Sequence, residues 1–133
     1  MFMIDPLANT PIYEQLTAQV EKLLLCGVLR PGDALPSVRA LSTRLSINPN
    51  TVQRAYSDLC QSGLVISIPK KGCFIANQAR ERLTAQNEAR LRAFAEKVRE
   101  LRLTDVTADT LHTIIDRVYT EGGEQDAVHQ EFA

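Results

Sequence analysis

The segment SINPNTVQRAY, from Ser46 to Tyr56, places a proline between two asparagines at the start of a pattern that is otherwise helical. Asn48 is a good N-cap residue, because its side-chain oxygen can accept a hydrogen bond from the first turn. Pro49 suits the first helical position, where its missing N–H costs no hydrogen bond. The segment therefore predicts a helix from Pro49 to about Ser62. Its first turns offer polar side chains, which is typical of a helix that touches another molecule.

Two further helices are predicted ahead of this one. Residues 11–27, PIYEQLTAQVEKLLLCG, carry apolar residues at three- and four-residue steps, the spacing of one buried helix face. Residues 35–45, LPSVRALSTRL, predict a shorter helix that Ser37 can cap, with Arg39 and Arg44 pointing away from its apolar side. Between these helices, LRPGDAL predicts a turn.

A β-hairpin is predicted after the third helix. Residues 64–76, LVISIPKKGCFIA, are rich in β-branched and aromatic residues and are interrupted by Pro69 to Gly72. Three helices with a tight turn between the second and third, followed by two strands with a basic turn, amount to a winged helix-turn-helix. The predicted fold class is therefore α+β, with residues 1–77 as a DNA-binding type of domain.

The remainder of the chain predicts two more helices, in a region covering residues 78–123. In the first, from about Gln78 to Arg102, four apolar residues repeat at 3, 4, 3 spacing and form an apolar seam: Leu91, Phe94, Val98 and Leu101. The second begins near Thr107, a good N-cap, and ends at Gly122-Gly123. It is predicted to bury Leu111, Ile114, Ile115, Val118 and Tyr119. Residues 124–133 are predicted to be a flexible tail.

The net charge of -1 hides an uneven distribution along the chain. Residues 1–78 carry seven Lys or Arg against five acids, and the rest carries eight against eleven. Between Pro36 and Gly72, five basic residues face only Asp58. A locally basic surface on a near-neutral protein fits a face that binds a polyanion, although a solvated mixed surface is an open alternative.

Cysteine and histidine patterns do not indicate an enzyme or a metal site. Cys26, Cys60 and Cys73 are widely separated and odd in number, which disfavours a disulfide framework and a zinc site. All three cysteines are predicted to be reduced, and Cys26 and Cys60 are predicted to pack as small apolar residues near helix ends. The two histidines, His112 and His129, have no partner at metal-ligand spacing. We expect no cofactor, no bound metal and no enzymatic activity.

The location is predicted to be cytoplasmic, with no membrane partner. No stretch approaches the roughly 18 to 20 apolar residues that a spanning helix needs. The start of the chain, MFMIDPL, lacks the positive flank and the long apolar run of a signal peptide.

The third helix is a candidate for reading DNA in the major groove. That groove is wide enough for one α-helix, and residues near the N-terminus of the helix reach the base edges. Asn50 and Thr51 could contact phosphates or bases, and free N–H groups at the helix start would favour a phosphate. Gln53 can pair with adenine and Arg54 with guanine. The alternative is a well-capped helix with solvated side chains.

The second helix and the hairpin would bring further groups to the same side. The lysines of the hairpin turn would supply charge, and Gly72, which lacks a Cβ, would let the backbone approach the minor groove closely. The candidate DNA-binding set is Ser37, Arg39, Asn50, Thr51, Gln53, Arg54, Lys70, Lys71 and Gly72.

Residues 11–76 resemble the DNA-binding domain of GntR-family bacterial transcription regulators. Four motifs carry the resemblance: P-I-Y-x-Q-L at 11–16, L-x-P-G-D-x-L-P-S-x-R at 29–39, N-x-N-T-V-x-R-A-Y at 48–56 and G-x-F-I at 72–75. The resemblance implies DNA contacts by Arg39, by the third helix and by Gly72. The family's hairpin often reads G-x-G-T-F-V, and here Lys70 replaces its first glycine and Cys73 its threonine.

The short C-terminal region resembles that of the YtrA subfamily. Most GntR members carry a much larger C-terminal domain than the roughly 55 residues left here. The resemblance implies a dimeric repressor, often associated with ABC-transporter genes, whose C-terminal helices form the dimer contact. The candidate dimer residues are Leu91, Phe94, Val98, Leu101, Leu111 and Ile115. Alternatively, these side chains dock on the chain's own DNA-binding domain.

Together these patterns predict a sequence-specific DNA-binding transcription regulator. It would be a homodimeric repressor that binds a two-fold symmetric double-stranded operator, possibly that of transporter genes by the YtrA resemblance. The alternative function is a protein-protein interaction module that uses the winged helix for docking, in which case the basic residues would have no shared purpose. The sequence does not identify a small-molecule effector.

Overall fold

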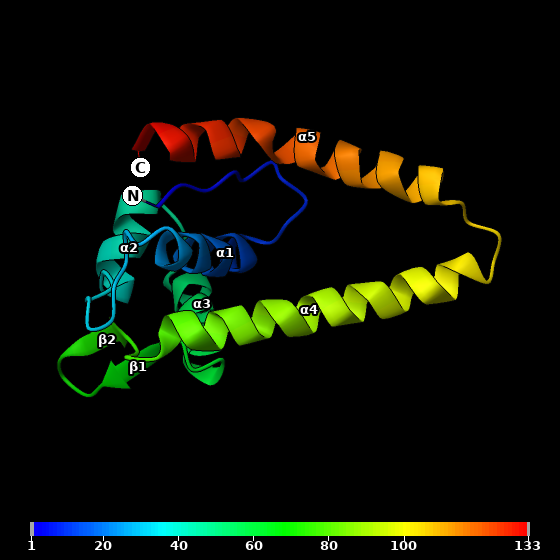
Figure 1. Ribbon diagram of the computed structural model, residues 1–133. Helices are drawn as coiled ribbons and strands as arrows, with labels where there is room; N and C mark the ends of the chain where they lie inside the picture. Colours follow the sequence, from blue (N-terminus) through cyan, green and yellow to red (C-terminus); the bar gives the residue numbers. More distant parts are fainter. Residues whose placement is uncertain (1, 133) are drawn as a thin grey trace. The chain divides into compact units, whose positions relative to one another are not determined.

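A computed structural model describes the backbone of residues 2–132 and the side chains of residues 2–121. The elements along the chain are α1 (Ile12–Leu25), α2 (Val38–Leu45), α3 (Pro49–Gln61), β1 (Val65–Ile68), β2 (Gly72–Ile75), α4 (Ala79–Arg102) and α5 (Ala108–Phe132), as labelled in Figure 1. Contacts divide the chain inside α4, into one compact unit that ends at Ala85 and a second that begins at Gln86. The three predicted helices and the predicted hairpin are confirmed, and with them the α+β winged helix.

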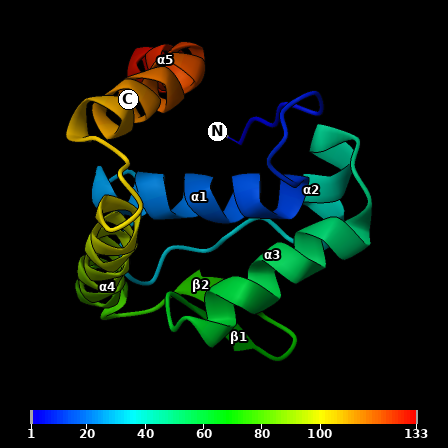
Figure 2. The same ribbon diagram turned by 90° about the vertical axis from the view of Figure 1, so that its right-hand side faces the viewer.

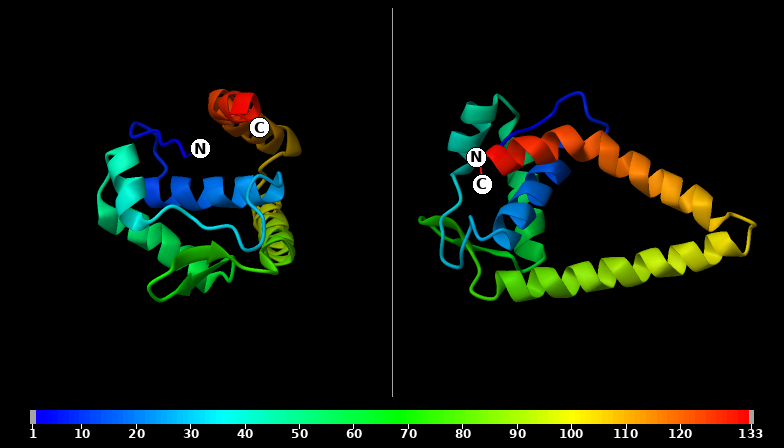
Figure 3. Two further views of the ribbon diagram at one scale, coloured as in Figure 1. Left: turned by 90° about the vertical axis from the view of Figure 1, so that its left-hand side faces the viewer. Right: turned by 45° about the horizontal axis from the view of Figure 1, so that its top comes forward.

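The first unit has one apolar core. The inner faces of α1 and α3 pack against each other, and the hairpin lies beside α3 (Figure 2). Figure 3 shows the same packing from two further sides. The core members share complete or nearly complete burial. The largest of those that are less than 2% exposed are Leu16, Leu24, Leu41, Leu59, Leu64, Ile75 and Leu83.

The N-terminal caps of α2 and α3 follow the prediction. The Ser37 hydroxyl accepts a hydrogen bond from the N–H of Ala40 at 3.0 Å. The Asn48 side-chain oxygen accepts one from the N–H of Asn50 at 2.8 Å, and Pro49 is the first residue of α3. Between the two helices, Ser46 adopts a left-handed conformation with φ of 55°, which ends α2 and makes the tight turn.

The hairpin is antiparallel, with Val65 opposite Ile75 and Ile68 opposite Gly72. A third segment, predicted from the sequence only as a turn, pairs with its second strand. Ala34 forms a bridge with Phe74, and the N–H of Leu35 donates to the carbonyl of Cys73 at 2.9 Å. The loop that leads into α2 is therefore attached to β2.

The first turns of α4 belong to the first compact unit, which ends at Ala85. Ala79 and Leu83 are fully buried in its core. The Arg82 guanidinium donates a hydrogen bond of 2.7 Å to the carbonyl of Gly63, at the corner between α3 and β1. Gly63 has φ of +80°, and a Cβ built there would lie 2.8 Å from Nη1 of Arg82. The glycine thus permits both the left-handed corner and the arginine contact.

Substituting this glycine tests the corner. We expect Gly63→Ala to destabilise the fold by more than the ~1–2 kcal/mol that left-handed backbone costs an L-residue, because Arg82 must also move. Gly27→Ala is the matched control, since Gly27 has the same φ of +80° and open space around its Cβ position. Urea unfolding of both variants gives the comparison. Equal losses would show that the arginine contact adds nothing.

The second unit contains the rest of α4 and α5. Thr107 caps α5 as predicted, accepting from the N–H of Thr110 at 3.2 Å. The predicted burial of the apolar residues of α5 is wrong for the single chain, because Leu111 is half-buried and the others are exposed: Ile114, Ile115, Val118 and Tyr119. Nothing within the described part of the chain covers them fully.

The predicted end of the last helix is also wrong. Helix α5 continues through Gly122-Gly123 to Phe132, so the residues assigned to a flexible tail, 124–133, fall in this helix up to Phe132. Glycine in a helix interior costs about 1 kcal/mol relative to alanine, which weakens a helix without forbidding it. Two glycines were therefore too weak a signal for a stop.

Candidate nucleic-acid interface

One side of α3 is exposed and polar. Its buried face consists of Val52, Ala55, Tyr56 and Leu59. The other side presents Asn50, Gln53 and Ser57 at steps of three and four residues, all exposed. The Gln53 amide donates to the Ser57 hydroxyl at 3.3 Å. Ser57 was not predicted as a site residue, although its spacing from Asn50 and Gln53 would have indicated it.

The start of α3 does not offer the free N–H groups that we expected for a phosphate. Pro49 has no N–H, and that of Asn50 is bound by the Asn48 side chain. The N–H groups of Thr51 and Val52 both reach the Asn48 carbonyl, at 3.0 and 3.4 Å. Thr51 is half-buried. Phosphate contact at this end must therefore come from side chains.

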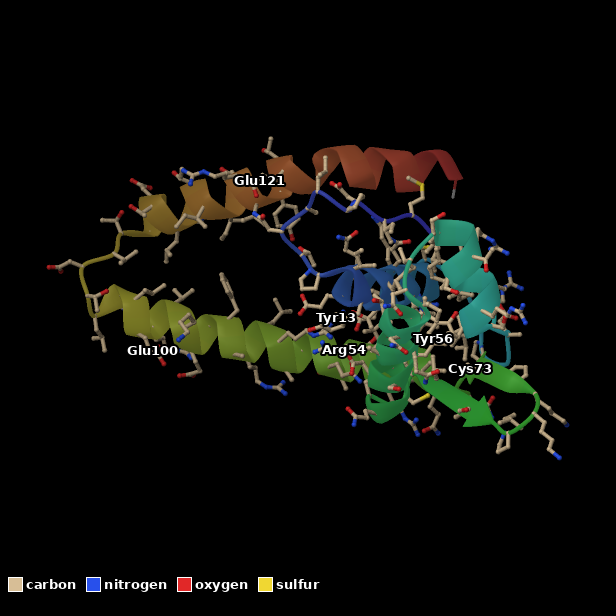
Figure 4. The ribbon with its side chains drawn as sticks, turned by 180° about the vertical axis from the view of Figure 1, so that it is seen from behind. Tyr13, Arg54, Tyr56, Cys73, Glu100 and Glu121 are labelled. Carbon is tan, nitrogen blue, oxygen red and sulfur yellow. The ribbon has the colours of Figure 1, made fainter. Side chains whose placement is uncertain are left out.

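Arg54 is exposed, and its guanidinium stacks on an aromatic ring of α1. Its central carbon lies 3.7 Å from the centre of the Tyr13 ring (Figure 4). The Tyr13 hydroxyl donates to Glu14 at 3.1 Å, and this hydrogen bond raises the pKa of Tyr13, while the Arg54 charge acts in the opposite direction. This contact limits the positions that the Arg54 side chain can occupy, because the guanidinium group lies over the Tyr13 ring of α1.

Tyr56 joins α3 to the loop before α2. Its ring is buried, and its hydroxyl donates to the carbonyl of Pro36 at 2.7 Å. Burial raises the pKa of Tyr56 well above its usual range, and the nearby Cys73 adds to the shift. Arg39 follows Pro36 by three residues, and Lys71 precedes Cys73 by two. The hydrogen bond of Tyr56 thus ties the loop before α2 to α3.

The hairpin turn holds a lysine in an unfavourable conformation. The N–H of Lys71 donates to the carbonyl of Ile68 at 3.0 Å, which closes the turn. Lys70 has φ of 67° and Gly72 has φ of 113°. A left-handed conformation costs a residue with a Cβ roughly 1–2 kcal/mol. The GntR family, which the sequence resembles, often has glycine at the position of Lys70. The lysine therefore adds a positive charge to the turn but lowers the stability of the fold.

Replacing Lys70 by glycine is expected to raise the stability of the fold and to weaken DNA binding. We expect Lys70→Gly to stabilise the fold by about 1 kcal/mol, because the strain is relieved. The same change is expected to reduce the log-log salt slope of DNA binding by about one for each phosphate contact that is lost. Lys71→Gly is the control, because it loses the same charge without relieving a left-handed φ. If urea unfolding showed that Lys70→Gly is less stable than the wild type, the left-handed conformation of Lys70 would not be a source of strain.

Every basic side chain between Pro36 and Gly72 is exposed. These are Arg39, Arg44, Arg54, Lys70 and Lys71. Ser37, the remaining candidate, is exposed but uses its hydroxyl oxygen as the cap of α2. Their exposure leaves the positive charges available to an anionic partner.

The helices and the possible metal ligands of the described residues exclude two kinds of site. Within residues 2–132, none of the helices combines the length and the apolar character that a membrane span requires. Among the described side chains, those of residues 2–121, no three His, Cys, Asp or Glu residues gather as ligands of one metal ion. Cys26 is exposed at the end of α1, so the prediction that it packs as a small apolar residue is wrong, whereas Cys60 packs against the core.

Comparisons with known proteins give the family. Residues 12–75 match the sequence profile described as "Bacterial regulatory proteins, gntR family". The HTH-type transcriptional repressor YtrA of Bacillus subtilis (strain 168) is 40% identical over 101 residues, which cover 76% of this chain and 75% of YtrA. The chain belongs to the gntR family. The resemblance seen in the motifs is thereby confirmed.

Two solved structures of similar proteins agree in fold. A protein from Listeria monocytogenes EGD-e, described as a transcriptional antiterminator, has a TM-score of 0.64 and 31% identity, with 89% of each chain covered. The DNA-binding domain of AraR, solved in complex with its operator ORX1, has a TM-score of 0.50 and 25% identity. That match covers 56% of this chain and 93% of the AraR domain. The chain is thus a gntR-family transcription regulator with a DNA-binding winged helix.

Proposed function

We propose that the protein is a homodimeric repressor that binds a two-fold symmetric DNA operator. Helix α3 enters the major groove with Asn50, Gln53 and Ser57 facing the base edges. Arg54 contacts DNA from the edge of α3 that lies nearest α1. The observation that carries this proposal is the exposed polar side of α3 in a unit whose basic side chains are all exposed between Pro36 and Gly72.

The other contacts act on the DNA backbone. Arg39, with Ser37 beside it, reaches phosphates from the start of α2, and Thr51 does so from the first turn of α3. The hairpin is the wing: Lys70 and Lys71 contact phosphates, and Gly72 permits a close backbone approach. AraR, which was solved with an operator, supports this use of the fold.

A second copy of the chain covers the apolar residues of the second unit. In α4, 67% of Leu91 and 52% of Phe94 are exposed, and Val98 and Leu101 are half-buried. In α5, Leu111 is half-buried and Ile115 is 36% exposed. Apolar side chains repeated along helices mark a protein interface when they stay exposed in the single chain.

The proposal also includes repression of transcription and a location in the cytoplasm. Repression is taken from YtrA of Bacillus subtilis, which is named a repressor. We place the protein in the cytoplasm, without enzymatic activity. Control of transporter genes stays a prediction from the resemblance to the YtrA subfamily.

Selection of binding sites from random DNA duplexes tests the function. We expect enrichment of one palindromic sequence whose half-sites lie about 10 base pairs apart, one turn of the double helix. An interaction module that docks proteins would enrich no sequence. An architectural DNA-binding protein would enrich only a broad base composition, and either outcome would end the proposal.

A further inference from the structure

Two side chains on the exposed side of α3 are joined to each other. Gln53 and Ser57 lie four residues apart, so they are neighbours on the surface of the helix, and both are exposed. The Gln53 amide nitrogen donates a hydrogen bond to the Ser57 hydroxyl oxygen at 3.3 Å. Neither residue belongs to the buried face of α3. The bond therefore affects what α3 presents to a partner, and not how the helix packs.

A glutamine side chain that is free in solution reads bases poorly. Its torsions rotate, and the last of them, which turns the plane of the amide, has only broad minima. The amide carries an acceptor oxygen and a donor nitrogen, and half a turn exchanges their places. A free amide therefore presents either group to a base, and it loses this freedom when it binds.

The hydrogen bond to Ser57 selects one arrangement of the Gln53 amide. The amide nitrogen has two hydrogens, and the Ser57 hydroxyl accepts one of them. The other hydrogen and the amide oxygen remain for a partner, as a donor beside an acceptor. Adenine presents the complementary pair in the major groove, an acceptor at N7 and a donor at N6. Guanine presents two acceptors there, so its O6 would face the amide oxygen. An amide held in this arrangement favours adenine over guanine.

The residue next to Gln53 is also supported by a neighbour. The central carbon of the Arg54 guanidinium lies 3.7 Å from the centre of the Tyr13 ring of α1. Two long polar side chains of α3 are thus each held by a second residue before any DNA is bound. Such ordering reduces the freedom that the side chains lose on binding.

We propose that Ser57 is a positioning residue, which holds the amide of Gln53 so that Gln53 reads one adenine in each half-site of the operator. Ser57 acts through Gln53 and reads no base itself. The reading of adenine rests on the proposed function, because it needs α3 in the major groove. The hydrogen bond between the two side chains does not depend on DNA.

The first experiment measures the order of the Gln53 amide in the free protein. NMR relaxation of side-chain amide groups is recorded on the full chain, and Gln53→Ala assigns the signal. We expect the Gln53 amide to be more ordered than that of Gln61, which is exposed at the end of the same helix. Ser57→Ala should make the two amides equally mobile, whereas Ser57→Thr, which keeps a hydroxyl, should preserve the order.

Two results of the relaxation experiment would overturn the positioning role. One is a Gln53 amide that is already as mobile as that of Gln61 in the wild type. The other is an order of the Gln53 amide that stays the same in Ser57→Ala. Loss of the fold does not complicate the comparison, because Ser57 is exposed and alanine is a better helix former than serine.

The second experiment compares the duplexes that the wild type and the variants select. We expect Ser57→Ala to relax the preference for adenine at one base pair of each half-site by about two- to tenfold, the range for freeing one flexible side chain. Gln53→Ala should lose the preference at the same base pair, and the double variant should lose no more. Ser57→Thr should retain it. The salt slope of binding should stay the same, because no variant changes a charge.

The selected duplexes also give the results that would contradict the proposal. If Ser57→Ala relaxed a different base pair from Gln53→Ala, Ser57 would read a base itself and would not act through Gln53. If the base pair that depends on Gln53 held guanine, the assigned arrangement of the amide would be wrong. If no duplex were selected, the reading of adenine would fail together with the proposed function. The relaxation experiment would still decide whether Ser57 holds Gln53.

Discussion

Replacing Arg54 by alanine lowers affinity for the selected operator by about thirtyfold or more and leaves the fold intact. A bidentate contact between arginine and guanine contributes roughly 1–3 kcal/mol of discrimination, and a dimer loses one such contact in each half-site, about 2–6 kcal/mol in all, which sets this range. The loss should be accompanied by relaxed preference at one base pair of each half-site. Fluorescence anisotropy on a set of single-base operator variants measures both. An affinity within about twofold of wild type would show that the proposed role of α3 is wrong.

Tyr13 separates two roles of this arginine. If the ring holds the guanidinium ready for DNA, Tyr13→Ala should cost about two- to fivefold in affinity for each half-site, the range of an exposed cation–π contact. Tyr13→Phe, which keeps the ring and loses the hydrogen bond to Glu14, is the matched control and should bind as wild type does. If Arg54→Ala and Tyr13→Ala lowered operator affinity equally and left the base preference unchanged, the role of Arg54 would be to join α3 to α1. It would then not read a base.

Phe94→Asp is expected to produce monomers. The side chain is 52% exposed in the single chain, and the proposed second copy covers it. Transfer of a carboxylate into an apolar interface costs several kcal/mol, so the dissociation constant should rise by more than about a hundredfold. Sedimentation velocity measures the oligomeric state directly, and affinity for the two-fold symmetric operator should fall with it.

Ala89→Asp is the control for the dimer experiment. It adds the same carboxylate to an exposed position of the same helix. With about 100° between successive residues, Ala89 lies on the opposite side of α4 from the apolar seam. This variant should remain dimeric. A dimer that survives Phe94→Asp would place the interface on other residues.

The elements with strong local signals were predictable from the sequence. Asn48 and Pro49 set the start of α3, and Ser37 that of α2, because a cap depends on residues a few positions apart. The same holds for Thr107 and for the hairpin with its turn at Pro69 to Gly72. Where the local signal was weak, as at Gly122-Gly123, the prediction failed.

Contacts between distant residues could not be predicted. The stack of Arg54 on Tyr13 joins residues 41 positions apart, and the bridge between Ala34 and Phe74 joins residues 40 apart. Such contacts depend on how helices cross and strands align, which periodicity does not encode. The absence of free N–H groups at the start of α3 follows from the cap itself, because Asn48 accepts hydrogen bonds from the first N–H groups of the helix. This consequence was predictable from the sequence, since buried and capped N–H groups need partners.

Helix α4 carries one apolar stripe with two environments. Ala79 and Leu83 are covered by the winged-helix core, whereas Leu91 and Phe94, further along nearly the same side, remain exposed. The angular phase between these two stretches is therefore encoded in the number of residues that separate them. Inserting one residue between Leu83 and Leu91 would turn the second stretch by about 100° about the helix axis, while inserting seven would restore it to within about 20°.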